Sequence, residues 1–383
     1  MKVISKDYRY VGVDDCQIDL FEGQFKVPEG MMYNSYVLID QKVAIMDTVD
    51  ISGTSDWMDN LDKALGSREP DYLIVHHMEP DHSSNIKNLV TKYPNITLVG
   101  NQKTFNLMDQ FFIDNSFKRL IVKEGDELNL GTHTLKFIMA PMVHWPEVMM
   151  SFDLTDHILF SADAFGKFGS SKADEEWDCE ARRYYFGIVG KYGVNVQMLL
   201  KKVKDLPIKA ICPLHGPILD NNIGYYVNLY NIWSSYQVET EGVLIAYTSV
   251  YGNTKRAALL LKDLLEEKGC PKIEIFDLAR DDMFEAIEGA FRYSKLVLAT
   301  TTYNNSIFPD MEKFIRGLIE RNYQNRKVAI IENGSWSPVA YKTITTLLAN
   351  SKNLTFIDPV VTIKSSVSNQ NIDDLKTLAD HLK

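Results

Sequence analysis

His77-Met78-Glu79-Pro80-Asp81-His82 is the stretch that decides the fold, because it places four potential metal ligands within six residues. Imidazole and carboxylate donors occur there in equal number, and this mixture of hard oxygen and nitrogen donors favours iron or manganese. The apolar run 71–75 just before it predicts a buried strand, so the ligands are expected on the loop at the end of that strand. Ser83 and Ser84 are expected to cap a following helix over 85–91 and so to hold the loop at both sides.

Three later residues extend this candidate metal site. Each follows a short apolar run that predicts a strand, at 135–139, 158–160 and 210–212. If these strands share a sandwich, their ends converge on one edge and bring seven ligands together: His77, Glu79, Asp81, His82, His144, Asp163 and His215. So many ligands exceed the needs of one ion and suit two ions that share a carboxylate. Three carboxylates and a bridging hydroxide neutralise two divalent ions, which limits the cost of burying the site.

Length, charge and cysteine content narrow the function classes. A chain of 383 residues is long enough for two or three domains, at about 150 residues each. The net charge of -10 and the absence of Lys/Arg blocks argue against nucleic acid or an anionic membrane as a partner. No apolar run approaches the roughly 20 residues of a membrane span, and the first seven residues lack a signal-peptide core, which predicts a cytoplasmic protein. The four cysteines lie far apart, so neither a disulfide framework nor a thiolate metal site is indicated.

The pattern of apolar runs changes near residue 240 and predicts two domains, 1–240 and 241–383. Before the change, many short apolar runs are interrupted by a few helical stretches, such as 57–65 and 196–203, which is typical of packed sheets with outer helices. After it, strand and helix patterns alternate, which implies a doubly wound parallel sheet. The five expected strands of that sheet cover 243–246, 272–276, 296–299, 328–331 and 359–363, and one expected helix covers 311–320.

Three loops of the second half predict a binding site for an anionic ligand. The first loop opens a helix expected to run to about residue 267, and its hydroxyls and free backbone N–H groups favour a phosphate without lysine. Doubly wound sheets bind ligands at their carboxyl edge, where all three loops are expected to meet. Their residues are Thr248, Ser249, Val250, Tyr251, Gly252, Asn253 and Thr254, then Thr301, Thr302, Tyr303, Asn304 and Asn305, then Asn333, Gly334, Ser335 and Trp336.

The order of the metal ligands is similar to that of the metallo-β-lactamase superfamily, whose zinc hydrolases usually carry His at the position of Glu79. With Glu79 there and a flavodoxin-like half behind it, the chain resembles a two-domain flavodiiron protein over essentially its whole length. The resemblance implies an N-terminal αββα metallo-β-lactamase-like sandwich and a flavodoxin-like sheet. It also implies that the three loops bind FMN, with Tyr303 and Trp336 beside the ring. In that family one iron takes the positions of His77, Glu79 and His144, the other takes Asp81, His82 and His215, and Asp163 bridges them.

The activity implied by this resemblance agrees with a count of electrons. FMN can hold two electrons and two ferrous ions can give two more, which matches the four needed to reduce dioxygen to two waters. The same pair of ferrous ions can reduce two nitric oxide molecules to nitrous oxide and water. We therefore expect reduction of oxygen, nitric oxide or both, and the spacing ranks neither gas.

The resemblance further implies how electrons arrive. Flavodiiron proteins form head-to-tail homodimers, alone or as dimers of dimers, that bring the FMN of one subunit beside the iron of the other. The chain carries no C-terminal rubredoxin-like cysteine module, so rubredoxin or another reductant is expected to act in trans.

Two alternatives remain open at this point. The first is a dinuclear zinc hydrolase of metallo-β-lactamase fold with a regulatory flavodoxin domain, against which Glu79 argues. The second is an FMN electron shuttle whose metal domain only docks partners.

Several residues near the predicted ligands have two readings. Lys26 and Tyr192 can reach the iron pocket as donors to bound oxygen species, although a solvated lysine and a packed tyrosine are the commoner roles. Trp145 is expected either in the core or near the flavin of a partner subunit. His76 does not fit the ligand spacing and is expected to be a packed or solvated neighbour. The remaining histidines, His133, His157 and His381, are expected on the surface or in turns.

Overall fold

The computed structural model describes residues 5–112, 116–174 and 176–383. The chain folds into two units, Met1–Asn231 and Ile232–Lys383, and the division between them falls inside helix α7 (Ile223–Ser234). The first strand of the second unit, β16, begins at Thr240. The domain limits expected from the sequence, 1–240 and 241–383, stay a prediction. None of the described helices is both long and apolar enough to cross a lipid bilayer.

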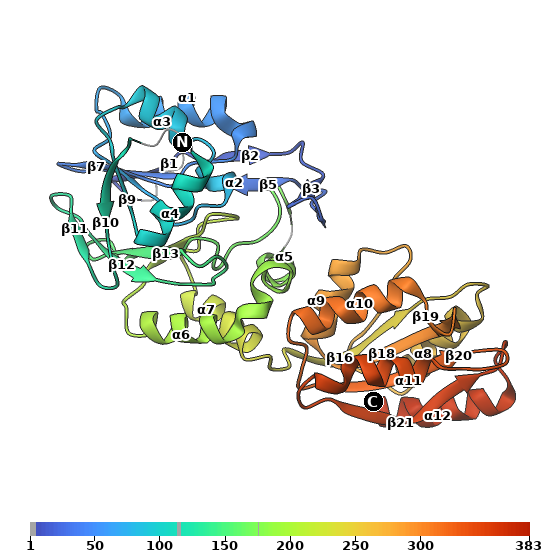
Figure 1. Cartoon of the computed structure of the whole chain (residues 1–383). Helices are drawn as coiled ribbons and strands as arrows, with labels where there is room; N and C mark the ends of the chain where they lie inside the picture. Colours follow the sequence, from blue (N-terminus) through green and yellow to red (C-terminus); the bar gives the residue numbers. More distant parts are fainter. Residues whose placement is uncertain (1–4, 113–115, 175) are drawn as a thin grey trace. The chain divides into compact units, whose positions relative to one another are not determined.

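Two mixed sheets form the core of the first unit (Figure 1). The six-stranded sheet has the order β1-β6-β7-β8-β9-β10, and the five-stranded sheet runs from β11 to β15 in chain order. Apolar side chains from both sheets, such as Leu38, Met46, Phe137 and Phe160, share one buried cluster, so the sheets pack face to face. The strands are β1 (Tyr8–Tyr10), β6 (Tyr36–Ile39), β7 (Val43–Met46), β8 (Tyr72–Ile74), β9 (Thr97–Gly100), β10 (Lys118–Ile121), β11 (Glu127–Asn129), β12 (Thr134–Met139), β13 (Met149–Asp153), β14 (Ile158–Phe160) and β15 (Ala210–Cys212).

Helices cover the outer faces of this sandwich, which confirms the predicted αββα arrangement. Figure 1 shows α1 and α3 on the side of the first sheet and α6 and α7 on the side of the second. Helix α1 buries Trp57, Leu61 and Leu65, which recur at the spacing of one helix face. The helices are α1 (Thr54–Leu65), α2 (Pro80–Ser83), α3 (Ile86–Lys92), α4 (Gln102–Phe111), α5 (Trp177–Tyr184), α6 (Gly193–Val203) and α7. Two short ribbons, β2 (Val13–Asp15) with β5 (Met31–Tyr33) and β3 (Leu20–Phe21) with β4 (Phe25–Lys26), complete the unit.

The second unit is a parallel sheet of order β17-β16-β18-β20-β21, the doubly wound order of flavodoxins. All five strands expected from the sequence are present, which confirms the predicted fold class. Strands β16 (Thr240–Tyr247), β17 (Ile273–Asp277), β18 (Tyr293–Tyr303), β20 (Lys327–Asn333) and β21 (Thr355–Ile363) form the sheet, and β19 (Ser306–Ile307) pairs with β18. The helices are α8 (Asn253–Glu267), α9 (Met283–Arg292), α10 (Pro309–Glu320), α11 (Ala340–Leu347) and α12 (Asn369–Leu382).

The prediction that two serines cap the helix after the metal-ligand loop is wrong. Ser83 lies inside the one-turn helix α2, and its hydroxyl donates to the Met78 carbonyl at 2.8 Å. Ser84 donates to the Pro80 carbonyl at 2.5 Å. Helix α3 begins after Asn85, whose amide instead donates to the Val49 carbonyl at 2.9 Å. Hydrogen bonds within the loop and to the segment after β7 therefore hold the ligands in place. The serine caps were predicted wrongly because the one-turn helix α2 is too short to show a periodic pattern in the sequence.

His133, expected on the surface or in a turn, is in fact buried between two carboxylates. Its Nδ1 lies 2.9 Å from Asp153 Oδ2 and its Nε2 lies 3.2 Å from Asp7 Oδ2. Burial alone would lower the pKa of this imidazole, but the hydrogen bonds with Asp153 and Asp7 and the nearby charge of Asp156 raise it. Since Asp7 precedes β1 and Asp153 ends β13, His133 ties the two sheets together at one edge.

Replacement of His133 tests this tie. Its pKa is higher in the folded than in the unfolded chain, so the stabilisation is complete below the unfolded pKa of about 6.5 and is lost as pH rises through the folded pKa. We expect His133→Gln to lower the unfolding free energy of the first unit by about 1–3 kcal/mol at pH 6 and by less at pH 9. Denaturant unfolding at both pH values checks this, with the exposed His381→Gln as control. An equal loss at both pH values would contradict it.

Candidate functional site

The seven predicted ligands meet at one end of the sandwich because each follows a strand. His77 and Glu79 lie on the loop after β8, and Asp81 and His82 lie in the short helix α2 that follows. The other three follow strands of the second sheet: His144 lies between β12 and β13, Asp163 follows β14 and His215 follows β15. Their ligand atoms form two groups, one of His77, Glu79, His144 and Asp163 and one of Asp81, His82 and His215.

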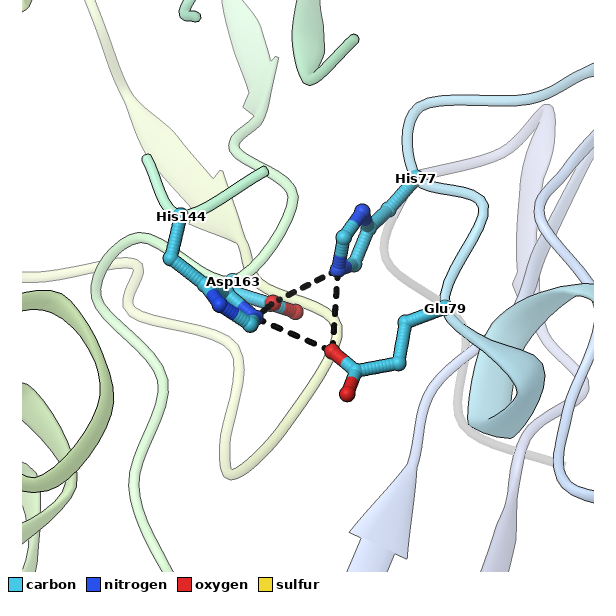
Figure 2. Close-up of side chains that lie close together, drawn as sticks. All are labelled: His77, Glu79, His144 and Asp163. Carbon is cyan, nitrogen blue, oxygen red and sulfur yellow. Dashed lines mark hydrogen bonds and ion pairs between the residues drawn. The ribbon is translucent and has the colours of Figure 1, made fainter. Parts of the chain in front are cut away.

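The first group is compact, and its four side chains point toward one another in Figure 2. His77 Nε2 lies 3.1 Å from Glu79 Oε2 and 3.3 Å from Asp163 Oδ2. His144 Nε2 lies 3.0 Å from the same Glu79 oxygen and 3.1 Å from the same Asp163 oxygen. Two nitrogens and two oxygens thus surround a common centre, which is the arrangement of a metal site with mixed hard donors.

The second group shares Asp163 with the first. His82 Nε2 and His215 Nε2 lie 3.1 Å apart, and they lie 3.3 Å and 3.2 Å from Asp81 Oδ2. The other carboxylate oxygen of Asp163, Oδ1, is 3.7 Å from His215 Nε2. Oδ2 of Asp163 therefore faces the first group and Oδ1 faces the second, as a carboxylate that bridges two ions requires.

Unpartnered buried oxygens show that this donor set fits metal ions. Among the described residues, Oδ1 of Asp81 and Oδ1 of Asp163 are buried without a hydrogen-bond donor. A buried carboxylate oxygen without a partner is costly, and a cation in contact with it removes that cost. Hard cations that accept oxygen and imidazole ligands are the ions that suit it.

The three loops of the second unit line one cavity of about 560 Å³ at the carboxyl edge of the parallel sheet. Ser337 and Ser365 also line it and were missed: Ser337 continues the third loop by one residue, and Ser365 follows β21, whose loop was not predicted to take part. Thr248 does not line the cavity, and its buried hydroxyl is 2.7 Å from that of Thr300. Gly252 supplies the left-handed N-cap of α8, with φ of 86°. A direct role of Thr248 and Gly252 in flavin binding stays a prediction.

The lining of this cavity fits a phosphate with a planar ring. Tyr251 and Trp336 are each 92% exposed, which is unusual for large aromatic side chains and leaves their faces free to stack on a ring. Thr301 carries a buried hydroxyl that has no partner among the described residues. Helix α8 begins at Asn253 and presents its free N–H groups there.

Comparisons with known proteins agree with both sites. The family model described as ODP family beta lactamase matches residues 31–216. An uncharacterized protein from Methanocaldococcus jannaschii is 31% identical over 320 residues, which cover 82% of this chain and 80% of that protein. An anaerobic nitric oxide reductase flavorubredoxin from Escherichia coli is 26% identical over 361 residues, which cover 91% of this chain and 75% of the relative.

Solved structures agree over the whole length. Rubredoxin oxygen:oxidoreductase from Desulfovibrio gigas superimposes with a TM-score of 0.92 at 22% identity, covering 100% of this chain and 97% of the other. The flavodiiron protein from Giardia intestinalis superimposes with a TM-score of 0.90 at 23% identity, covering 99% and 95%. This chain belongs to the flavodiiron proteins.

In the flavodiiron ligand set, neighbouring carboxylates and imidazoles shift one another's pKa values. Burial alone would raise the pKa of Glu79, but hydrogen bonds from His144 and His77 lower it to about 2. Burial would likewise lower the pKa of His144, whereas Asp163 and Glu79 raise it to about 9. Glu79 therefore stays ionised and His144 holds a proton at neutral pH while no metal is bound. A metal ion takes over that positive charge, so its binding releases protons.

A layer of residues behind the flavodiiron ligands fixes their orientation. The buried Glu147 accepts hydrogen bonds through Oε1 from His77 Nδ1 at 2.8 Å and from the Met78 backbone at 2.9 Å. His215 Nδ1 donates to the Met32 carbonyl at 2.8 Å. Both bonds leave Nε2 of the imidazole directed at the metal position. Glu147 was missed in the sequence, although a carboxylate three residues after His144 and ahead of an apolar strand is a usable signal.

His76 supports the site without joining it, as the ligand spacing predicted. Its Nδ1 lies 2.5 Å from Asp47 Oδ2 and its Nε2 lies 2.8 Å from the Ser151 hydroxyl. Asp47 also accepts from the backbone N–H of His76 at 2.7 Å. Because Asp47 follows β7 and Ser151 lies in β13, this buried trio joins the two sheets directly behind the His77 loop.

Aromatic rings enclose the second ligand group. Phe21, Tyr33 and Tyr184 approach the His215 ring with centroids at 5.3, 5.9 and 5.5 Å. Tyr184 is fully buried, and its hydroxyl has no partner among the described residues. Burial, followed by the charges of Asp163 and other nearby carboxylates, raises the pKa of this hydroxyl well above its ordinary value, so it is a permanent donor. Sequence reasoning missed Tyr184 because a tyrosine inside an amphipathic helix carries no signal of its orientation.

The sequence left two roles open for Lys26, Tyr192 and Trp145, and the structure shows the position of each. Lys26 is exposed on β4, and Tyr192 is half-buried at the end of a 3₁₀ turn, Gly190–Tyr192. Trp145 is half-buried and approaches the rings of His77 and His144 edge-on, with centroids at 5.2 and 6.2 Å. A role for Lys26 or Tyr192 with bound oxygen, and for Trp145 beside a flavin, stays a prediction.

Removal of Glu147 tests the layer behind the ligands. We expect Glu147→Ala to weaken iron binding by about 10–100-fold, because His77 loses the acceptor that orients it. Iron retained against a competing chelator measures this effect. Glu127→Ala, at an exposed carboxylate of β11, is the matched control and should bind iron like the unmodified chain. Equal iron retention by both variants would show that Glu147 does not position the ligand.

Proposed function

We propose that this flavodiiron protein reduces dioxygen, nitric oxide or both at a non-heme diiron site, with electrons that pass through FMN. The placement of Asp163 carries this proposal, since one of its oxygens faces each of two ligand groups. Glu79 supports it by supplying an oxygen donor between His77 and His144. The relatives support the class of reaction, because one is named a nitric oxide reductase and another an oxygen oxidoreductase.

Each cofactor has its own set of residues in this proposal. His77, Glu79 and His144 hold one iron, Asp81, His82 and His215 hold the other, and Asp163 holds both. FMN occupies the cavity of the second unit, with its phosphate at the start of α8. When bound, two ferrous ions and reduced FMN supply the four electrons that take dioxygen to two waters, or the two that take two nitric oxide molecules to nitrous oxide and water.

The chain itself contributes orientation, exclusion of water and a hydrogen-bond donor. Glu147 and the Met32 carbonyl hold His77 and His215 in one orientation. The rings of Phe21 and Tyr33 limit the water that reaches the second ligand group, which suits small uncharged gases. The buried hydroxyl of Tyr184 is free to donate to an oxygen atom of the gas.

A dinuclear zinc hydrolase is not favoured. Zinc hydrolases of this fold usually carry imidazole where this chain has Glu79, whose carboxylate takes part in the first ligand group. An electron shuttle without metal is also disfavoured, because the buried oxygens of Asp81 and Asp163 would stay unsatisfied.

The electron donor and the assembly are further parts of the proposal. Rubredoxin or a similar small electron carrier is the proposed donor, in line with the name of the Desulfovibrio gigas protein. A head-to-tail homodimer, alone or as a dimer of dimers, is the proposed assembly, so that FMN of one subunit serves iron of the other. A cytoplasmic location stays a prediction from the sequence.

The decisive experiment compares consumption of the two gases by the anaerobically reduced protein, with iron and FMN quantified on the same sample. We expect consumption of at least one gas. Asp163→Asn should lower that rate about 100-fold and reduce the iron content while FMN content is unchanged, because the anionic bridge is lost. Consumption of neither gas by a sample that holds iron and FMN would overturn the proposal, and ester hydrolysis by a zinc-loaded sample would support the hydrolase.

A mixture of two variants tests the head-to-tail assembly. Ser249→Asp places a carboxylate beside the proposed phosphate position and is expected to abolish FMN binding, whereas Asp163→Asn is expected to lose activity at the iron site. Random co-assembly should restore about a quarter of the normal rate, since half of the dimers hold both variants and each of these has one intact flavin–iron pair. No recovery, with mixed dimers shown to be present by mass spectrometry, would place electron transfer within one subunit.

A further inference from the structure

A groove on the first unit belongs neither to the metal site nor to the flavin cavity. It has a volume of about 490 Å³ and lies between the end of β10, the first turn of α4 and the segment 139–148, which leads from β12 to β13. Figure 1 shows these elements near one another. Strand β10 is the last strand of its sheet, which leaves room for a groove on this side of the sandwich.

The lining of this groove is mainly apolar. Val122, Met139 and Val148 contribute to it, and so do Ile121, which is 46% exposed, and the exposed Pro146. Exposed apolar side chains that gather in one place mark surfaces where another molecule binds. A cavity of this volume, with an apolar lining and few polar groups, is typical of sites for small molecules.

Two polar groups of the lining already have partners within the protein. The side chain of Asn101 caps α4, and its amide donates to the Glu147 carbonyl at 2.5 Å. The carboxylate of Glu124 is bonded to the ammonium group of Lys202. Glu124 is the only acidic residue of the lining among the described residues, so its negative charge is neutralised where it borders the groove.

Two lysines leave positive charge at the groove. Lys103 and Lys123 both line it and are exposed, and the Lys103 ammonium group donates to the Pro146 carbonyl at 3.4 Å. Within the described parts of the chain, neither ammonium group lies within ion-pair distance of a carboxylate. The chain as a whole has a net charge of -10, so two unpaired cations beside an apolar floor form a local exception. They complement an anion that has an apolar body.

We propose that this groove binds one molecule of a water-soluble amphiphilic anion, such as a medium-chain carboxylate. The apolar chain lies against Ile121 and Val148, and the carboxylate pairs with Lys103 and Lys123. A molecule in this position lies against the segment that carries His144, although it needs neither iron nor flavin to bind. An anionic membrane is a poorer occupant, because the net charge of the chain repels it.

Titration calorimetry of the full chain with decanoate tests the site. We expect saturable binding of one decanoate per chain, with a Kd of about 0.1–1 mM for a ligand of this size. Decyltrimethylammonium, which has the same chain and the opposite charge, should bind about tenfold more weakly. Replacement of both Lys103 and Lys123 by glutamine should remove most of this difference, whereas Lys87→Gln, at an exposed lysine of α3, should leave it unchanged.

A matched pair of variants on β10 tests the apolar floor. Ile121→Asp places a carboxylate in the groove and should weaken decanoate binding about tenfold or more. Leu120→Asp is the control, because neighbouring residues of a strand point to opposite faces and Leu120 does not line the groove. Both side chains are exposed, at 46% and 36%, so both variants are expected to fold.

The position of the ligand can be observed directly. With carbon-13 in the methionine methyl groups, the resonance of Met139, assigned by Met139→Leu, should move as decanoate is added. No shift of that resonance, or equal decanoate binding by Ile121→Asp and Leu120→Asp, would overturn the proposal. A lighter assembly of Ile121→Asp alone in sedimentation would also overturn it, since a second copy of the chain would then cover the groove. Co-flotation of the unmodified protein, but not of Ile121→Asp, with phosphatidylglycerol vesicles would make a membrane the occupant instead.

Discussion

A single buried carboxylate holds the metal site together. Asp163 directs Oδ2 at His77 and His144 and Oδ1 at His215, and these partners come from loops of both sheets. The two groups of ligands can share Asp163 only when the sheets are packed face to face. Assembly of the apolar core and completion of the metal site are therefore coupled, because loss of packing between the sheets separates the ligands.

The two sites of the chain use different physical means to hold their charges. In the first unit, charged ligands are buried and depend on one another and on the residues behind them, such as Glu147 and Asp47. In the second unit, neutral hydroxyls, amides and a helix N-terminus line the cavity, and exposed aromatic faces border it. The metal site accordingly tolerates little change in any of its members, whereas the flavin cavity distributes its contacts over many weak ones.

The sequence predicted the fold class and the candidate metal ligands, because those ligands come after strands with clear apolar patterns. The sequence did not predict the residues that surround the metal ligands and orient them. Glu147 and Tyr184 reach the site by the path of a loop and of a helix, and local pattern contains no information on those paths. His133 stands beside turn residues, so its burial between Asp7 and Asp153 depends on pairing across two sheets. The misplaced serine caps follow from a four-residue helix that has no period to detect.

Arg326 determines where the flavin unit can be cut from the chain. Its buried guanidinium donates to the carbonyls of Tyr236 and Gln237, each at 2.8 Å, and to that of Phe291. A polypeptide that started at residue 241 would lack two of these acceptors and would bury a cation with too few partners. A separately expressed flavin unit must therefore begin upstream of Tyr236, because the arginine ties the segment between α7 and β16 to this unit.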